Sequence, residues 1–148
     1  MISFSTYNIP DELSSIIKDF LSKLEKNLNI ELLSTQFSQL QTIEINFLTQ
    51  SEIQKLNLQY RNINKPTDVL SFNLTNIGEL DLSLDIIHEN ALSLSEDFHQ
   101  EIFRCIIHGC LHIFGYDHVE KLIPETLSQE EMFIIQEKIL TNVSSSSL

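Results

Sequence analysis

The sequence has no tryptophan and, in 148 residues, only three glycines, three prolines and two cysteines. Cys105 and Cys110 lie five residues apart in an apolar segment, so on a helix they would occupy different faces. This separation argues against a disulfide and favours a reducing compartment. No run of about 18 apolar residues is present, and the N-terminus lacks a basic segment followed by an apolar one. We therefore expect a cytoplasmic protein that does not cross a membrane.

Basic residues are also scarce. The chain has 9 Lys and Arg against 21 Asp and Glu, which gives a formal net charge of −12. Such an acidic balance disfavours broad, non-specific binding to nucleic acids or to anionic membranes. An anionic substrate would have to be met by a few well-placed cations, or be delivered by a partner.

Hydrophobic periodicity predicts strands alternating with helices. Alternating apolar and polar residues or short apolar runs predict strands at 2–7, 42–48, 68–72 and 80–86, the last with one solvent-exposed face. Apolar stripes of helical period predict helices at 11–28, 50–61, 87–92 and 97–114, with a last helix capped at Ser128 and running through Ile139. Thr49 and Glu52 form a capping box, and Arg61 falls at the end of the helix that they begin.

These elements predict one α+β domain over residues 1–143, with a mixed sheet of about four strands packed with about five helices. The order of the strands cannot be read from one sequence. Residues 144–148 are mostly serine, so we expect them to form a disordered tail.

Three histidines form the most specific motif of the chain, His108-x-x-x-His112-x-x-Gly115-x-x-His118. On a helix, His108 and His112 lie on one face with Cβ atoms about 5–6 Å apart, close enough to bind one ion. Gly115 favours a left-handed turn that would return His118 as a third ligand. Histidines on an apolar helix can also be ordinary core residues, but three at this spacing favour a metal site. Three neutral nitrogens leave a fourth tetrahedral position open to water, which predicts one catalytic Zn²⁺ per chain.

The same spacing is found in metzincin peptidases, whose helical Glu directly follows the first His. Here that position is Gly109, so the usual peptidase base is missing. Either the substrate is not a peptide, or the metal and another group activate the water.

Three segments resemble the YbeY family of bacterial endoribonucleases in order and spacing. They are Leu56-Asn57-Leu58-Gln59-Tyr60-Arg61, Pro66-Thr67-Asp68-Val69-Leu70-Ser71-Phe72, and the histidine segment from His108 to His118. The resemblance covers roughly residues 40 to 140, and the histidine segment is its most specific part. Glu79 stands where the family usually has Asp.

The resemblance implies a cytoplasmic, single-strand-specific endoribonuclease with zinc on His108, His112 and His118. It implies action on ribosomal RNA, at the 3′ end of the small-subunit RNA, and in ribosome quality control, with RNA and the ribosome or ribosome-associated proteins as partners. Arg61 matches the family's RNA-holding residue, and its planar guanidinium suits a phosphate. Otherwise Arg61 would be a solvated cation at a helix end.

Other candidate residues stay outside the catalytic assignment. Asp117 could orient a ligand or act as a base, or could simply cap a turn. Asp68 could have a similar role or could only accept hydrogen bonds at the start of its strand. Lys55 and Lys65 could extend a basic patch around Arg61, or could simply be exposed.

Two alternative functions remain open. A zinc-dependent peptidase or amidase is favoured by the ligand spacing and disfavoured by Gly109. A ribosome-associated binding protein would need zinc only for folding. A chelator separates the catalytic from the structural role, because removal of a structural ion unfolds the protein.

Overall fold

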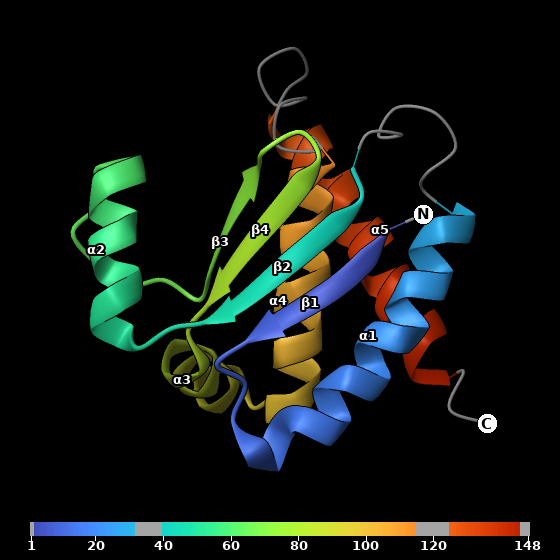
Figure 1. Cartoon of the computed structure of the whole chain (residues 1–148), viewed down its shortest axis with the longest axis horizontal. Helices are drawn as coiled ribbons and strands as arrows, with labels where there is room; N and C mark the ends of the chain where they lie inside the picture. The colour runs from blue at the N-terminus through green and yellow to red at the C-terminus, as the bar shows by residue number, and fades with distance from the viewer. Residues whose placement is uncertain (1, 32–39, 115–124, 146–148) are drawn as a thin grey trace.

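The computed structural model describes residues 2–31, 40–114 and 125–145 (Figure 1). The strands are β1 (Ser3–Tyr7), β2 (Thr42–Phe47), β3 (Val69–Asn73) and β4 (Ile77–Leu82). The helices are α1 (Asp11–Glu31), α2 (Gln50–Arg61), α3 (Leu84–Leu94), α4 (Phe98–Ile113) and α5 (Glu125–Ser145). The predicted α+β class, with one mixed sheet and five helices in the described ranges, is confirmed.

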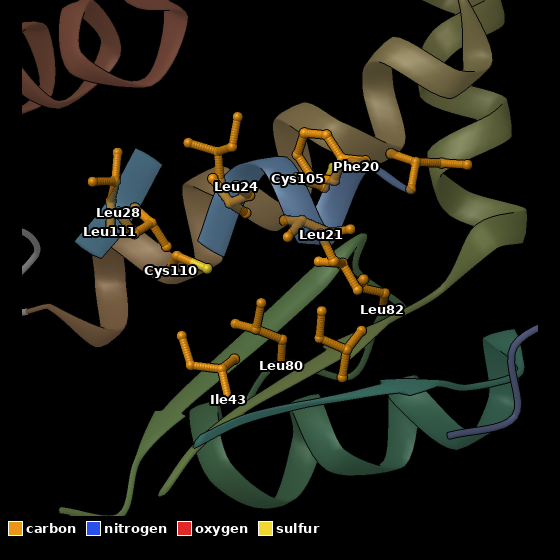
Figure 2. Close-up of a cluster of buried hydrophobic side chains, with 14 of the residues drawn as sticks. Phe20, Leu21, Leu24, Leu28, Ile43, Leu80, Leu82, Cys105, Cys110 and Leu111 are labelled. Atoms are coloured by element: carbon orange, nitrogen blue, oxygen red, sulfur yellow. The ribbon is translucent and has the colours of Figure 1, made fainter. Parts of the chain in front are cut away.

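The sheet has the order β1-β2-β4-β3. The strands β1, β2 and β4 run parallel, whereas β3 pairs antiparallel with β4 and lies at the edge of the sheet. On one side α1 and α4 pack against the sheet and α5 packs against both of these helices, while α2 lies apart from them near β3 (Figure 1). Ile43, Leu80 and Leu82 point from the sheet toward Leu21 and Leu24 of α1 and toward α4 in the core (Figure 2).

The central helix α4 is buried along most of its length, as its apolar sequence predicts. Two glycines allow it to approach the sheet closely. A Cβ on Gly78 would lie 2.9 Å from Cδ1 of Ile113, and one on Gly109 would lie 2.6 Å from Cδ2 of Leu80. Larger residues at either position would push α4 away from β4.

The two cysteines are unpaired and buried on α4, which confirms that they form no disulfide. Burial raises the pKa of both thiols, and for Cys105 the nearby carboxylates of Asp68 and Glu101 add to the effect. Neither cysteine is therefore available as a thiolate nucleophile. Within the described ranges, none of the helices combines the length and the hydropathy needed to span a bilayer.

The predicted strand at 80–86 is wrong in its second half. The strand β4 ends at Leu82, and the N–H of Ser83 makes the last ladder bond, to the carbonyl of Asp68 at 3.0 Å. The carbonyl of Ser83 then accepts from the N–H of Ile87 at 3.0 Å, which begins α3. The alternation of apolar residues continues through Ile86 although the backbone has become helical, so periodicity alone misplaced the boundary.

The solvent-exposed face predicted for this strand is also wrong at Asp81, which is only 2% exposed. Its Oδ1 accepts a hydrogen bond from Nδ2 of Asn46 at 3.0 Å. Burial, together with the neighbouring Glu79 carboxyl, raises the pKa of Asp81 to about 7.

The last helix is longer than predicted at both ends. It begins at Glu125, so Ser128 lies inside the helix and does not cap it. It continues to Ser145, so the first two residues of the predicted tail are helical. Residues 146–148 lie outside the described part of the chain.

Candidate active site

His108 and His112 converge on one point. They lie one turn apart on α4, with their Nε2 atoms 2.8 Å apart and their ring centroids 4.4 Å apart. Two nitrogens that bind the same zinc at 2.0–2.1 Å can lie no more than about 4.2 Å apart. The two nitrogens are hydrogen-bonded to each other in this structure, and their separation lies within the limit for two ligands of one ion. His118 lies outside the described residues, and the residues that are described contain no group of three or more metal-binding side chains.

A buried glutamine of α5 orients His108. Oε1 of Gln136 lies 2.8 Å from Nδ1 of His108. Because an amide oxygen only accepts hydrogen bonds, Nδ1 carries the proton and the lone pair of Nε2 is directed toward the point shared with His112. This is the arrangement by which a second residue fixes the tautomer of a metal-binding histidine.

An ion network holds Gln136 in place. Its amide donates to Oε2 of Glu137 at 3.1 Å, and the same oxygen accepts from Nε of Arg104 at 2.9 Å. Arg104 also pairs with Glu101 on its own helix. Burial alone would raise the pKa of Glu137, but hydrogen bonds from Arg104 and Gln136 lower it below its usual value. The charged network therefore links α4 to α5 directly behind His108.

Arg61 is the last residue of α2, as its position after the capping box predicts. The hydroxyl of Thr49 accepts from the N–H of Glu52 at 3.2 Å, and the Glu52 carboxylate accepts from the N–H of Thr49 at 2.9 Å. The helix ends at Asn62, which takes a left-handed conformation with φ of 58°. The side chain of Arg61 is exposed, and no ion pair joins it to another described residue. Its guanidinium is thus available to an anion.

One cavity of about 520 Å³ brings these groups together. Arg61 and Tyr60 at the end of α2 line it, and so do His108 and His112 of α4. The remaining lining comes from β3 and the residues before it, namely Thr67, Asp68, Val69, Leu70, Ser71 and Phe72. Lys55 and Lys65 are exposed and do not belong to the lining.

Asp68 acts at the start of β3, as one of its two interpretations predicts. Its Oδ1 accepts from the N–H of Val69 at 2.8 Å and from the hydroxyl of Thr67 at 3.3 Å. Its Oδ2 accepts from the thiol of Cys105 at 3.7 Å. Oδ1 therefore accepts hydrogen bonds at the start of the strand, and Oδ2 contacts α4 through Cys105. Asp117 lies outside the described residues.

Gly109 faces the sheet and not the cavity. A side chain there would meet Leu80 at 2.6 Å and Val69 at 3.3 Å. A glutamate, which serves as base at this position in metzincins, would be driven into the core. The site therefore has neither the peptidase base nor room for it at this position.

Sequence reasoning missed Gln136. The residue lies 28 positions after His108 on another helix, and no motif marks it. Only its place inside a helix, on a face with Met132 and Ile139, indicated that it is buried.

Comparisons with known proteins show the family of this chain. The family model described as Endoribonuclease YbeY matches residues 3–144. The Endoribonuclease YbeY of Limosilactobacillus reuteri (strain DSM 20016) is 31% identical over 156 residues, which cover 92% of this chain and 91% of the relative. The Endoribonuclease YbeY of Thermotoga maritima is 35% identical over 127 residues, 82% of each chain.

A solved structure has the same fold. The solution structure of a protein from Thermotoga maritima superimposes with a TM-score of 0.68 at 29% identity, over 99% of this chain and 91% of the other. Together with the family match over residues 3–144, this likeness establishes that the chain belongs to the YbeY family of endoribonucleases, which are hydrolases that cleave RNA.

Proposed function

We propose that this protein is a zinc-dependent, single-strand-specific endoribonuclease that processes ribosomal RNA at the 3′ end of the small-subunit RNA and takes part in ribosome quality control. The family membership supports a role in ribosomal RNA maturation. The observation that supports the zinc-dependent mechanism is the shared cavity, which His108 and His112 line together with Arg61, a cation that has no ion pair within the described ranges.

His108 and His112 would hold the ion, with His118 as the third ligand that the sequence motif supplies. When bound, such an ion would supply Lewis-acid chemistry for a phosphoryl oxygen and for water. Gln136 keeps His108 in the tautomer with a free Nε2 lone pair. With zinc bound, the site would not need the glutamate that peptidases use to activate water.

Arg61 would hold the phosphodiester. Its planar guanidinium can donate two parallel hydrogen bonds to two phosphoryl oxygens. As water adds to phosphorus and the bond to one ribose oxygen breaks, negative charge grows on those oxygens. A fixed cation at this position stabilises that charge.

The acidic composition favours delivery of the RNA over its capture from solution. A net charge of −12 repels RNA at long range, and the cavity has one lining cation among its described residues. We infer that the substrate is presented on the ribosome or by a ribosome-associated protein.

The test is cleavage of single-stranded RNA by purified protein with added zinc, without it, and after chelation. We expect cleavage only with zinc, and an apoprotein that remains folded by circular dichroism. An apoprotein that unfolds would mean a structural ion. Zinc-dependent proteolysis of casein by homogeneous protein would instead support the peptidase alternative and overturn the proposal.

A further inference from the structure

The edge strand β3 directs a row of backbone groups away from the sheet. The N–H of Ser83 donates to the carbonyl of Asp68 at 3.0 Å, and the N–H of Leu74 donates to the carbonyl of Ile77 at 2.8 Å. Asp68 and Leu74 therefore belong to hydrogen-bonded pairs of the antiparallel ladder. Because such pairs alternate with non-hydrogen-bonded ones, the residues at 69, 71 and 73 point their N–H and C=O groups away from β4.

Among these outward-pointing groups, the N–H and C=O of Ser71 lie beside the candidate site. The N–H of Val69 is already taken by Oδ1 of Asp68 at 2.8 Å, which agrees with its outward direction. Ser71 forms a non-hydrogen-bonded pair with Leu80, and β3 has no strand on its other side among the described residues, so its N–H and C=O have no ladder partner there. Ser71 lines the same cavity as His108 and His112. An unused hydrogen-bonding pair thus faces the space where the substrate would lie.

The N–H and C=O of Ser71 are suited to form hydrogen bonds with the edge of a nucleobase. In an extended strand, the N–H and C=O of one residue point in the same direction. An unpaired nucleobase has neighbouring acceptors and donors on its Watson–Crick edge, which proteins read when the base is splayed out of a single strand. A base in a duplex cannot be read in this way, because its partner occupies that edge.

An aromatic platform stands beside Ser71 in the cavity. Tyr60 is 58% exposed, and its ring contacts Phe72 in an edge arrangement with centroids 5.2 Å apart. Both residues line the cavity next to Arg61. An exposed ring held in this way is a surface on which proteins stack the bases of single strands.

We propose that Ser71 and Tyr60 form a base-binding subsite that holds one unpaired nucleobase next to the phosphate bound by Arg61. The inference rests on the proposed function and gives a physical reason for single-strand selectivity. An extended peptide could also pair with a free strand edge. The neighbouring aromatic ring and phosphate-binding cation favour a nucleotide.

The N–H of Ser71 can be removed without breaking the ladder. Proline lacks this donor and is tolerated on an edge strand where the N–H faces outward. Ser71→Ala is the matched control, since it removes the hydroxyl and keeps the backbone N–H. We expect Ser71→Pro to cleave single-stranded RNA about two- to tenfold more slowly than Ser71→Ala in single-turnover assays. The assay is repeated on oligonucleotides with one abasic ribose near the cleaved bond. When the abasic ribose replaces the nucleotide whose base Ser71 binds, Ser71→Pro and Ser71→Ala should cleave at the same rate.

Tyr60 gives an independent readout that needs no cleavage. An oligonucleotide carrying the fluorescent base 2-aminopurine should be quenched when that base stacks on Tyr60. Tyr60→Phe keeps the ring and should bind like the wild type. Tyr60→Leu should lose the quenching and bind about five- to a hundredfold more weakly. If thermal melting shows that Ser71→Pro is unfolded, the Tyr60 variants and the abasic oligonucleotides still test the base-binding subsite.

The outcomes separate the subsite from the proposed function. Three results would overturn the subsite if zinc-dependent cleavage is still observed. They are an absence of quenching, a wild-type cleavage rate for Tyr60→Leu, and abasic substitutions that slow all variants equally. The proposed nuclease function would then still stand. Quenching without zinc-dependent cleavage would support the subsite and refute the proposed function. Binding of an extended peptide that Ser71→Pro abolishes, with RNA binding unchanged, would assign the edge to a protein partner and overturn the subsite.

Discussion

Replacing Arg61 by alanine tests how the phosphate is held. Arg61 is exposed at the end of α2 and has no ion pair with any described residue. Its truncation therefore leaves no buried partner unsatisfied, and the free energy of unfolding should change by no more than about 0.5 kcal/mol. Zinc content should also be unchanged, because Arg61 is on a different helix from His108 and His112.

The size of the rate effect follows from the lost hydrogen bonds. A hydrogen bond to a charged group is worth about 1.5–3 kcal/mol, and about 1.4 kcal/mol corresponds to a factor of ten in rate. Arg61→Ala should therefore slow single-turnover RNA cleavage by roughly ten- to a hundredfold. Arg61→Lys should recover part of the rate, because an ammonium keeps the charge and loses the planar pair of donors.

The assay compares single-turnover cleavage, zinc content and thermal stability of the wild type and both variants. Lys55→Ala is the matched control, since Lys55 is an exposed cation on the same helix outside the cavity lining. It should cleave at nearly the wild-type rate. If Arg61→Ala also did so, Arg61 would be only a solvated cation at a helix end, and the phosphate would have to be held elsewhere.

Four further outcomes are expected. The protein should hold about one zinc per chain by elemental analysis, and His112→Ala should lose it; equal metal in both would refute the site. Gln136→Leu should weaken zinc binding about ten- to a hundredfold in a competition titration, while Gln136→Glu, which keeps an acceptor for His108, should lose less. Gly109→Ala should lower the free energy of unfolding by about 1–3 kcal/mol, because its Cβ would lie 2.6 Å from Cδ2 of the buried Leu80; unchanged denaturant midpoints would contradict this packing. Because the folded-state pKa of Asp81 is raised to about 7, its protonation stabilises the fold at low pH, and this contribution is lost as pH rises from about 4 to 7. Asp81→Asn should flatten that part of the stability curve, and an identical pH dependence in both proteins would rule out the assignment.

Features set by neighbouring residues were predictable from the sequence. The capping box of Thr49 and Glu52 begins α2 and leaves Arg61 at its end, since both bonds span three residues. The four-residue spacing puts His108 and His112 on one face of the helix, because one helical turn separates them, and their Nε2 atoms lie 2.8 Å apart. The fold class followed from periodicity alone.

Boundaries between elements were less predictable. The alternation across Leu82 and Ile86 suits a strand and also the first turn of a helix. The hydrogen bonds of Ser83 to Asp68 and Ile87 decide where one ends and the other begins. The bond to Asp68 requires β3 to lie beside β4, and periodicity within one segment does not contain that information.

The composition of the site was decided by the tertiary structure. The strand order puts β3 at the sheet edge, and this position brings Arg61 and Ser71 to the same cavity as the histidines. The packing of α5 on α4 supplies Gln136, and the close approach of α4 to β4 turns Gly109 toward Leu80. The sequence by itself determined the helices, most of the strands and the paired histidines, because those depend on hydrogen bonds and spacings within a few residues. The other residues of the site were not determined in this way. They come from distant segments, and only the packing of the sheet and the helices brings those segments to the histidines.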